Sequence, residues 1–358
     1  RVMERDTIEV YERQAGDYLA ARPKRDLITA GARALSAAAR RIGPVVDLGC
    51  GPGIYTPDLG SSPVALDASR AMLDLTRTAA PHALLVQADL ERPPFAPRSL
   101  GGAFARASYQ HVAPERLPLA LARLHACLAV GSPVTLVVVA ADDGEPDTFV
   151  SSDDLPGRTF WRWDPDHFAD VVAGAGFTVE GVDRDGPWLW LRGRRERTLA
   201  DTVAPGMTVL VCGLNPSLHA ADAGYGYAGP ANRFWPAALA AGLVDVARDP
   251  FHALERGVGM TDVVKRATPR AADLARDEFR AGVARVERLV GWLNPAVVCF
   301  VGLAGYRAAV DRRATVGWHE FGGVPAYVMP STSGLNAKTS LAELSEHLRE
   351  VRRRAKRR

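Results

Sequence analysis

The sequence has 358 residues, of which 47% are apolar and 24% are charged. This composition is typical of folded globular proteins and excludes a mainly disordered or collagen-like chain, while the length suggests two domains. The longest apolar run, at 133–141, is far shorter than the roughly 20 residues that a membrane-spanning helix needs. The first six residues carry no apolar signal-peptide core, so we expect a cytoplasmic protein without a membrane partner.

Cysteine spacing and charge distribution further limit the kinds of site and partner that we expect. The four cysteines are Cys50, Cys127, Cys212 and Cys299. They lie more than 70 residues apart and form no Cys-x-x-Cys pair, so we expect reduced, buried thiols and no metal site. The net charge of +3 divides into −3 for residues 1–197 and +6 for the remainder. Most of that excess lies in a basic tail, 353–358, which either contacts phosphates or is the solvated end of a helix.

Short β-rich apolar runs alternate with helical stretches in both halves, which is the pattern of parallel α/β sheets. In the first half we expect strands at 45–48, 64–67, 84–86, 102–105, 134–139, 177–181 and 188–191, and helices at 70–78 and 117–128. The sequence therefore predicts a three-layer α/β/α domain for residues 1–195.

A polar, arginine-rich stretch follows, and we place a linker at 196–206. In the second half we expect strands near 208–212, 296–301 and 325–329, and helices near 233–241, 277–292 and 340–352. This pattern predicts a second α/β/α domain with a short parallel sheet at 207–352, followed by the tail.

The sharpest feature of the first half is the run Asp-Leu-Gly-Cys-Gly-Pro-Gly at 47–53, directly after the first expected strand. Its glycines let the backbone turn tightly and bring N–H groups close to a ligand. Asp67 ends the next strand, where a carboxylate can bind a ribose diol. Asp89 follows the third strand and is placed to reach an adenine amino group.

With these motifs, residues 11–193 resemble the class I S-adenosylmethionine-dependent methyltransferases. The resemblance implies a Rossmann-like fold that binds S-adenosyl-L-methionine as cofactor. The residues it assigns to the cofactor are Tyr18, Asp47, Gly49, Gly51, Gly53, Asp67, Asp89 and Leu90. The first of these belongs to a Tyr11-x-x-x-Ala15-x-x-Tyr18 run that resembles a cofactor-capping helix. NAD binding, the alternative, usually requires Gly-x-Gly-x-x-Gly, which is absent here.

The methyl acceptor stays open. The segment 106–109 reads Arg-Ala-Ser-Tyr where amino-methylating nucleic-acid enzymes carry Asp/Asn-Pro-Pro-Tyr/Phe, and no cysteine follows a proline, as cytosine C5 methylation requires. Tyr109 and His111 lie where acceptor-side residues often occur, and His111 is either a general base or a solvated loop residue. The aromatic cluster at 160–163 either lines an acceptor pocket or packs at a sheet edge.

Three motifs of the second half point to a pocket for a flipped base. Gly-Leu-Asn-Pro-Ser at 213–217 places a neutral amide after a strand, where α/β sheets bind ligands. The loop at 225–235 carries aromatic rings suited to stacking on a planar base. The segment 329–336 offers a projecting leucine, Leu335, as a wedge into a base stack.

With these motifs, residues 203–351 resemble the mismatch-specific uracil/thymine DNA glycosylases of the uracil-DNA glycosylase superfamily. The resemblance implies that Asn215 is catalytic. The residues it assigns to the base pocket are Gly213, Leu214, Tyr227 and Asn232, and those it assigns to the intercalating loop are Ser333, Gly334, Leu335 and Asn336. The family's Gly-Ile-Asn-Pro-Gly signature is changed at Leu214 and Ser217, and Lys338 stands for an arginine aimed at a DNA phosphate. The segment from Met260 to Phe279 is also similar, whereas the scattered cysteines exclude the iron–sulfur branch.

Breaking the glycosidic bond to a pyrimidine places positive charge on the sugar and negative charge on the departing base. The protein therefore needs a positioned water and hydrogen-bond donors. Asn215 can hold the water only through its carbonyl, and so forgoes general-base help worth typically ~10²–10⁴-fold. We predict a slow enzyme on double-stranded DNA with a mismatched pyrimidine, which prefers G·U and G·T to A·U because a mismatched base is the easiest to extrude.

The leading hypothesis is thus a bifunctional protein, with an S-adenosylmethionine-dependent methyltransferase of unknown acceptor joined to a DNA glycosylase. In one alternative the second domain only binds DNA and is not catalytic. In another the two domains are functionally unlinked and the methyl acceptor is a small molecule.

Overall fold

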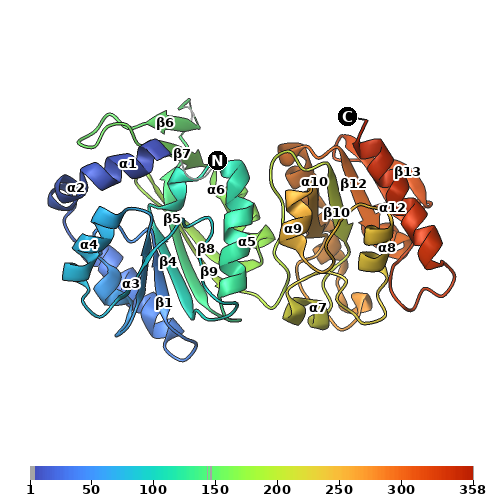
Figure 1. Cartoon of the computed structure of the whole chain (residues 1–358), viewed down its shortest axis with the longest axis horizontal. Helices are drawn as coiled ribbons and strands as arrows, with labels where there is room; N and C mark the ends of the chain where they lie inside the picture. The colour runs from blue at the N-terminus through green and yellow to red at the C-terminus, as the bar shows by residue number, and fades with distance from the viewer. Residues whose placement is uncertain (1–4, 143, 146, 358) are drawn as a thin grey trace. The chain divides into compact units, whose positions relative to one another are not determined.

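The computed structural model describes residues 5–142, 144, 145 and 147–357. The chain divides into two compact units, one formed by Arg1–Ala173 and Phe177–Glu196, and the other by Gly174–Gly176 and Arg197–Arg358. Each unit is built on one large β-sheet with helices around it (Figure 1). Among the described residues, no helix combines the length and apolar character needed to cross a membrane.

The sheet of the first unit has a parallel core in the order β3-β2-β1-β4-β5. Its strands are β1 (Val45–Leu48), β2 (Val64–Asp67), β3 (Leu84–Gln87), β4 (Gly102–Arg106) and β5 (Pro133–Ala140). Beside β5 lie the antiparallel strands β9 (Trp188–Arg195) and β8 (Phe177–Asp185), and the short pair β7 (Thr159–Trp163) and β6 (Thr148–Val150) joins the end of β5. The strand order reverses between β1 and β4, and open α/β sheets bind ligands at such a switch point.

The helices of the first unit are α1 (Arg5–Arg13), α2 (Ala15–Ala21), α3 (Asp26–Ala39), α4 (Arg70–Ala79), α5 (Leu117–Cys127) and α6 (Pro165–Gly174). The start of α4 is fixed by Ser69, whose hydroxyl accepts a hydrogen bond from the N–H of Met72, as an N-cap does. Met72, Leu73 and Thr76 recur at three- and four-residue spacing and are the buried residues of this helix. The predicted three-layer architecture is confirmed.

The second unit has a five-stranded sheet in the order β11-β10-β12-β14-β13. Its strands are β10 (Val209–Gly213), β11 (Val258–Asp262), β12 (Val297–Val301), β14 (Val324–Met329) and the antiparallel edge strand β13 (Gly317–Phe321). The parallel strands are almost continuously apolar and buried, because helices cover both faces of such a sheet. The predicted short parallel sheet is confirmed.

The helices of the second unit are α7 (Leu218–Ala223), α8 (Phe234–Ala240), α9 (Pro250–Glu255), α10 (Arg276–Leu293), α11 (Leu303–Ala309) and α12 (Leu341–Ala355). Helix α12 packs across β10, β12 and β14 and buries Leu344, Leu348 and Val351. Ser340 and Glu343 form a capping box at its start. Because α12 runs to Ala355, the first residues of the expected basic tail are the last turn of this helix.

The stretch that we expected to be a linker, 196–206, is instead mostly packed within the second unit. Thr202 exchanges two backbone hydrogen bonds with Met260 of β11, at 3.0 and 2.9 Å. Asp201 is buried and pairs with Lys265 at 2.7 Å and with Arg285 at 2.6 Å. Composition alone suggests a linker here because the stretch is polar and arginine-rich, but its polar groups are used in buried pairs.

Candidate functional sites

A cavity lies at the carboxyl ends of β1, β2 and β4 in the first unit, at the switch point of the sheet. Six of the eight residues assigned to the cofactor by resemblance line it, namely Tyr18, Asp47, Gly49, Gly51, Asp67 and Leu90. Residues from separate segments therefore meet at one place, as a bound ligand requires.

Asp67 ties the glycine-rich loop to the end of β2. Its carboxylate accepts hydrogen bonds from the N–H of Gly51 at 2.9 Å and from the N–H of Ser69 at 2.8 Å. Burial raises the pKa of Asp67 to about 6, although these backbone donors oppose the shift. The loop takes its shape from positive φ at Gly49 (66°) and Gly51 (55°), which other residues rarely adopt. A carboxylate thus lies in the cavity, next to the backbone of the glycine-rich loop.

Asp47 is the second acid of the cavity and is only 4% exposed. Its Oδ2 accepts a hydrogen bond from the hydroxyl of Thr56 at 2.6 Å. Burial raises its pKa to about 7, so the fold holds this carboxyl close to its point of neutralisation.

Gly53 and Asp89 are not among the described residues that line the cavity. A Cβ at Gly53 would stand 2.8 Å from Cγ2 of Thr76, so this glycine serves the close approach of the loop to α4. Asp89 accepts a hydrogen bond from the N–H of Glu91 at 2.9 Å and so stabilises its own turn. Only Leu90 of the predicted adenine-side pair reaches the cavity wall.

Helix α1 and the loop after β4 meet at the cavity through Tyr11 and His111. The ring of Tyr11 packs edge-on against Tyr18, with centroids 5.5 Å apart. The Nδ1 of His111 lies 2.6 Å from the carbonyl of Thr159, so it donates there, and Nε2 accepts from the Tyr11 hydroxyl at 2.9 Å. Burial lowers the pKa of His111 to about 4. His111 is therefore a neutral, buried residue and not the solvated loop histidine of one alternative.

Other acceptor-side candidates are part of the core. Tyr109 is 1% exposed, and its hydroxyl has no hydrogen-bond partner among the described residues. Of the aromatic cluster at 160–163, Phe160 and Trp163 are buried in and around β7, and Phe160 stacks on Phe149 with centroids 5.0 Å apart. The structure thus supports edge packing for this cluster.

In the second unit, Asn215 lies in the turn between β10 and α7. Its side-chain Nδ2 donates to the hydroxyl of Thr268 at 2.8 Å and to the carbonyl of Arg266 at 3.1 Å. Ser217 accepts from the N–H of Ala220 at 3.1 Å and so caps α7. With its N–H donors used by the protein, the Asn215 amide presents its carbonyl oxygen as an acceptor to which no described residue donates. This is the orientation that a water-holding role requires.

Tyr227 lies at the same end of the sheet as Asn215. Its ring stacks on Phe234 with centroids 4.2 Å apart and an interplanar angle of 25°. The backbone has φ of +60° at Tyr227, and the preceding carbonyl, of Gly226, accepts a hydrogen bond from the indole of Trp235 at 2.9 Å. Its hydroxyl lies 3.3 Å from where a Cβ of Gly213 would stand. The aromatic residue and the glycine motif are therefore neighbours, as predicted.

Asp262 joins this group, although sequence reasoning assigned it no role. It ends β11 and is the register partner of Gly213 in the parallel pair β10–β11. Its Oδ1 would stand 2.2 Å from a Cβ at Gly213, so only glycine leaves room for the carboxyl. No hydrogen bond or ion pair links this carboxyl to another described residue. Burial raises its pKa to about 6, against the opposing charge of Lys265. An acidic residue directly after a β-rich run was the available signal, as it was for Asp67.

Arg233 fixes the loop that carries the predicted wedge, Leu335. Its guanidinium donates to the carbonyl of Ser333 at 3.2 Å, and also to the carbonyls of Asn336 and Thr339. Leu335 projects from this loop with 96% of its surface exposed. Such an exposed leucine on a fixed loop has the form of an intercalating wedge.

The remaining predicted residues have structural neighbours or face solvent. Leu214 packs against Gly305 of α11, and Asn232 accepts a hydrogen bond from the N–H of Phe234 at 2.9 Å. Asn336 holds its own loop by donating to the carbonyl of Ser331 at 2.7 Å. Lys338 is exposed. The geometry thus gathers Gly213, Asn215 and Tyr227, while the DNA roles of the other residues stay predictions.

Family comparisons agree with this division of the chain. A family model described as the uracil DNA glycosylase superfamily matches residues 200–356, and one described as a methyltransferase domain matches residues 45–131. The chain joins a methyltransferase domain to a uracil DNA glycosylase superfamily domain. The fusion expected from the motifs is thereby confirmed at this level.

Solved structures similar to the chain match about half of it. The DhpI–SAH complex has 20% identity, covers 54% of this chain and 96% of its own, and has a TM-score of 0.44. The 1,6-didemethyltoxoflavin-N1-methyltransferase of Burkholderia thailandensis has 20% identity, covers 53% and 87%, and has a TM-score of 0.39. A possible histamine N-methyltransferase of Thermotoga maritima has 16% identity, covers 53% and 100%, and has a TM-score of 0.40.

Proposed function

We propose that the methyltransferase domain binds S-adenosyl-L-methionine in the cavity at the carboxyl ends of β1, β2 and β4. The observation that supports this most is the position of Asp67, whose carboxylate lies in the cavity while it holds the glycine loop through Gly51. Such a carboxylate can accept hydrogen bonds from a ribose diol. The cofactor supplies the methyl group, and the protein binds and orients it.

Calorimetric titration of the full chain with S-adenosyl-L-methionine tests this proposal. We expect saturable binding. Asp67→Ala should weaken the affinity at least about tenfold, since a hydrogen bond to a charged group contributes about 1.5–3 kcal/mol to the binding free energy. Asp74→Ala is the matched control, because Asp74 lies on the surface of α4, where it pairs with Arg70. Equal affinity in the wild type and Asp67→Ala contradicts the assignment.

For the second domain we propose base excision: hydrolysis of the N-glycosidic bond of uracil or thymine in G·U and G·T mismatches. The supporting observation is the orientation of Asn215, whose Nδ2 is bound by Thr268 and Arg266 and whose carbonyl is free. A carbonyl held in this way can position the attacking water, but it cannot take up the water's proton. The reaction is therefore slow and depends on stabilisation of the leaving base.

The departing base would lie between Tyr227 and the carboxyl of Asp262. When protonated, that carboxyl donates a hydrogen bond to a base oxygen and so stabilises the negative charge that develops there. When ionised, it opposes the same charge. Because the pKa of Asp262 is raised to about 6, the change from the neutral to the ionised carboxyl falls in a pH range where the excision rate can be measured.

Selection for mismatches follows from the cost of extrusion. A few kcal/mol are needed to take a base out of the duplex, and a mismatched base costs least. Leu335 would fill the space that the base leaves, which stabilises the extruded state. The domain therefore acts mainly at mismatches, where extrusion of the base costs least.

The test is release of uracil from an end-labelled duplex with one G·U pair, scored as abasic sites under single-turnover conditions. We expect release by the wild type and at least a 100-fold slower release by Asn215→Ala, with unchanged duplex affinity. A G·C duplex is the negative control. Mismatch binding without release by the wild type would favour a non-catalytic DNA-binding domain, and equal release by both proteins would remove Asn215 from the mechanism.

A further inference from the structure

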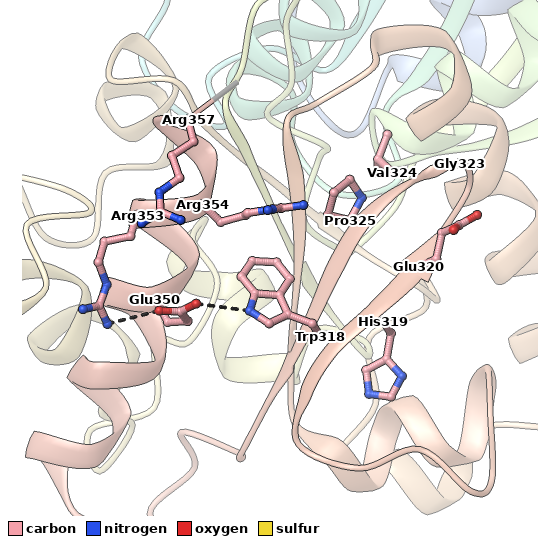
Figure 2. Close-up of a pocket in the computed structure, with 10 residues that line it drawn as sticks. All are labelled: Trp318, His319, Glu320, Gly323, Val324, Pro325, Glu350, Arg353, Arg354 and Arg357. Atoms are coloured by element: carbon pink, nitrogen blue, oxygen red, sulfur yellow. Dashed lines mark hydrogen bonds and ion pairs between the residues drawn. The ribbon is translucent and has the colours of Figure 1, made fainter.

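A second cavity of the glycosylase superfamily domain lies between the edge strand β13 and the last turns of α12 (Figure 2). Its volume of about 520 Å³ falls in the range of small-molecule and cofactor sites. Trp318 from β13 forms one wall, and Arg353, Arg354 and Arg357 from the end of α12 form the other. Neither the proposed excision chemistry nor the methyl transfer uses these residues.

Trp318 is an exposed ring that is nevertheless held in place. Trp318 is 38% exposed. The indole N–H donates to Glu350 at 3.2 Å, and the ring packs edge-on against Tyr327 with centroids 4.9 Å apart. A large, oriented aromatic surface at a sheet edge is a stacking platform for a planar ligand.

Positive charge beside the ring is not neutralised. Arg353 pairs with Glu350 at 3.1 Å, whereas Arg354 and Arg357 make no ion pair with any described residue. The guanidinium of Arg354 lies 5.9 Å from the centre of the Trp318 ring. Figure 2 shows the other acid, Glu320, on the opposite side of Trp318 from Arg353 and Arg357. The negative end of the α12 dipole favours cations here, but it does not account for the exposed tryptophan.

The cavity is lined by residues other than those proposed for excision. Strand β14 begins at Val324 in the cavity wall and ends at Met329, just before the loop of Leu335. Trp318 is the register partner of Tyr327, two residues before that end of the strand.

We propose that the cavity binds one nucleotide unit of single-stranded DNA, with the base stacked on Trp318 and the phosphate between Arg354 and Arg357. Paired guanidinium groups bind phosphate oxygens, and a base fits the ring beside them. An acidic peptide would use the arginines but would have no need of the ring. The proposal depends on DNA being the partner but not on catalysis by Asn215.

Fluorescence anisotropy of a labelled dT8 oligonucleotide with the full chain tests this site. We expect Arg354→Ala/Arg357→Ala to weaken binding at least tenfold and to reduce the salt slope by about 0.7, the contribution of one phosphate contact on a single strand. Trp318→Ala should weaken binding about fivefold or more without changing the slope, and Trp318→Phe should restore most of it. Arg312→Ala/Arg313→Ala is the control, because these arginines are exposed elsewhere in the same domain.

Two further measurements separate this site from the excision function. Uracil release from a short blunt G·U duplex should be unchanged in Trp318→Ala, and dT8 binding should be unchanged in Asn215→Ala. An octaglutamate peptide should compete weakly and be insensitive to Trp318→Ala. Unaltered dT8 affinity in the arginine and tryptophan variants, or a peptide that binds as tightly as dT8, would overturn the proposal. Thermal unfolding of each variant checks that the fold is retained.

Discussion

The carboxyl of Asp262 lies directly over Gly213, with Oδ1 only 2.2 Å from where an alanine Cβ at 213 would stand. Gly213→Ala should therefore displace Asp262, lower the melting temperature and slow uracil release at least about tenfold. The combined variant Gly213→Ala/Asp262→Ala removes the clash, so its melting temperature should return to that of Asp262→Ala alone. A melting temperature of Gly213→Ala equal to that of the wild type contradicts this contact.

The pH dependence of excision should report the protonation of Asp262. Its pKa, raised to about 6, means that the donating, neutral form dominates below pH 6 and the ionised form above it. Uracil release should therefore become faster as the pH falls from 8 to 5.5. The charged groups that act on this carboxyl are Lys265, Arg285 and Asp201.

Asp262→Asn supplies the matched control for that profile. The amide is a permanent donor without a charge, so its rate should be flat across the same pH range and should exceed the wild-type rate at pH 8. A variant slower than the wild type throughout would show that the ionised carboxylate is the useful form. Single-turnover rates at each pH measure both cases.

Thr268 should act through the orientation of Asn215. Its hydroxyl accepts from Asn215 at 2.8 Å and donates to the carbonyl of Arg270 at 2.9 Å. Thr268→Val removes one acceptor of the Asn215 amide, which then keeps only the carbonyls of Arg266 and Pro216. This should slow release roughly tenfold, with little change in duplex affinity. Thr268→Ser keeps the hydroxyl and should stay near the wild-type rate. Weaker DNA binding with an unchanged rate would exclude a positioning role.

Asp47 should make the stability of the methyltransferase domain depend on pH. Its pKa is raised from 3.8 to about 7 on folding, so the folded state binds the extra proton and its advantage is lost as the pH rises through 7. Asp47→Asn should raise the melting temperature at pH 8 but not at pH 4, because the amide oxygen still accepts from Thr56. Calorimetry of the full chain measures this, with the transition assigned by its response to S-adenosyl-L-methionine. An equal change in melting temperature at both pH values would show that the protonation of Asp47 does not affect stability.

The long strands could be predicted because each is an apolar run bounded by turn residues, as at Pro133–Ala140 and Val297–Val301. The edge strand Gly317–Phe321 was missed, since Trp, His and Glu in succession give no burial pattern, and only pairing with β14 makes it a strand. The short helix Pro250–Glu255 was also missed. It depends on the cap from Asp249 and not on periodicity.

The candidate sites divide in the same way. Asn215 follows β10, Asp67 ends β2, and Tyr227 lies in the aromatic loop before α8, so local motifs indicate all three. An acidic residue after a β-rich run was the local signal for Asp262, but its contact with Gly213 depends on register between segments 49 residues apart. Arg233 was placed in a helix signature, but its hold on the loop of Leu335 spans about 100 residues. Long-range pairing of this kind leaves no trace in the local pattern.

The attachment of Asp201 and Thr202 to β11 decides where the gene can be divided. A fragment that starts at 207 would leave Lys265 and Arg285 without their shared counter-ion and would uncover the backbone of Met260 along an open strand edge. Such a fragment should aggregate on expression. A fragment that starts at 197 keeps all these partners and is the sensible choice for producing the C-terminal half alone.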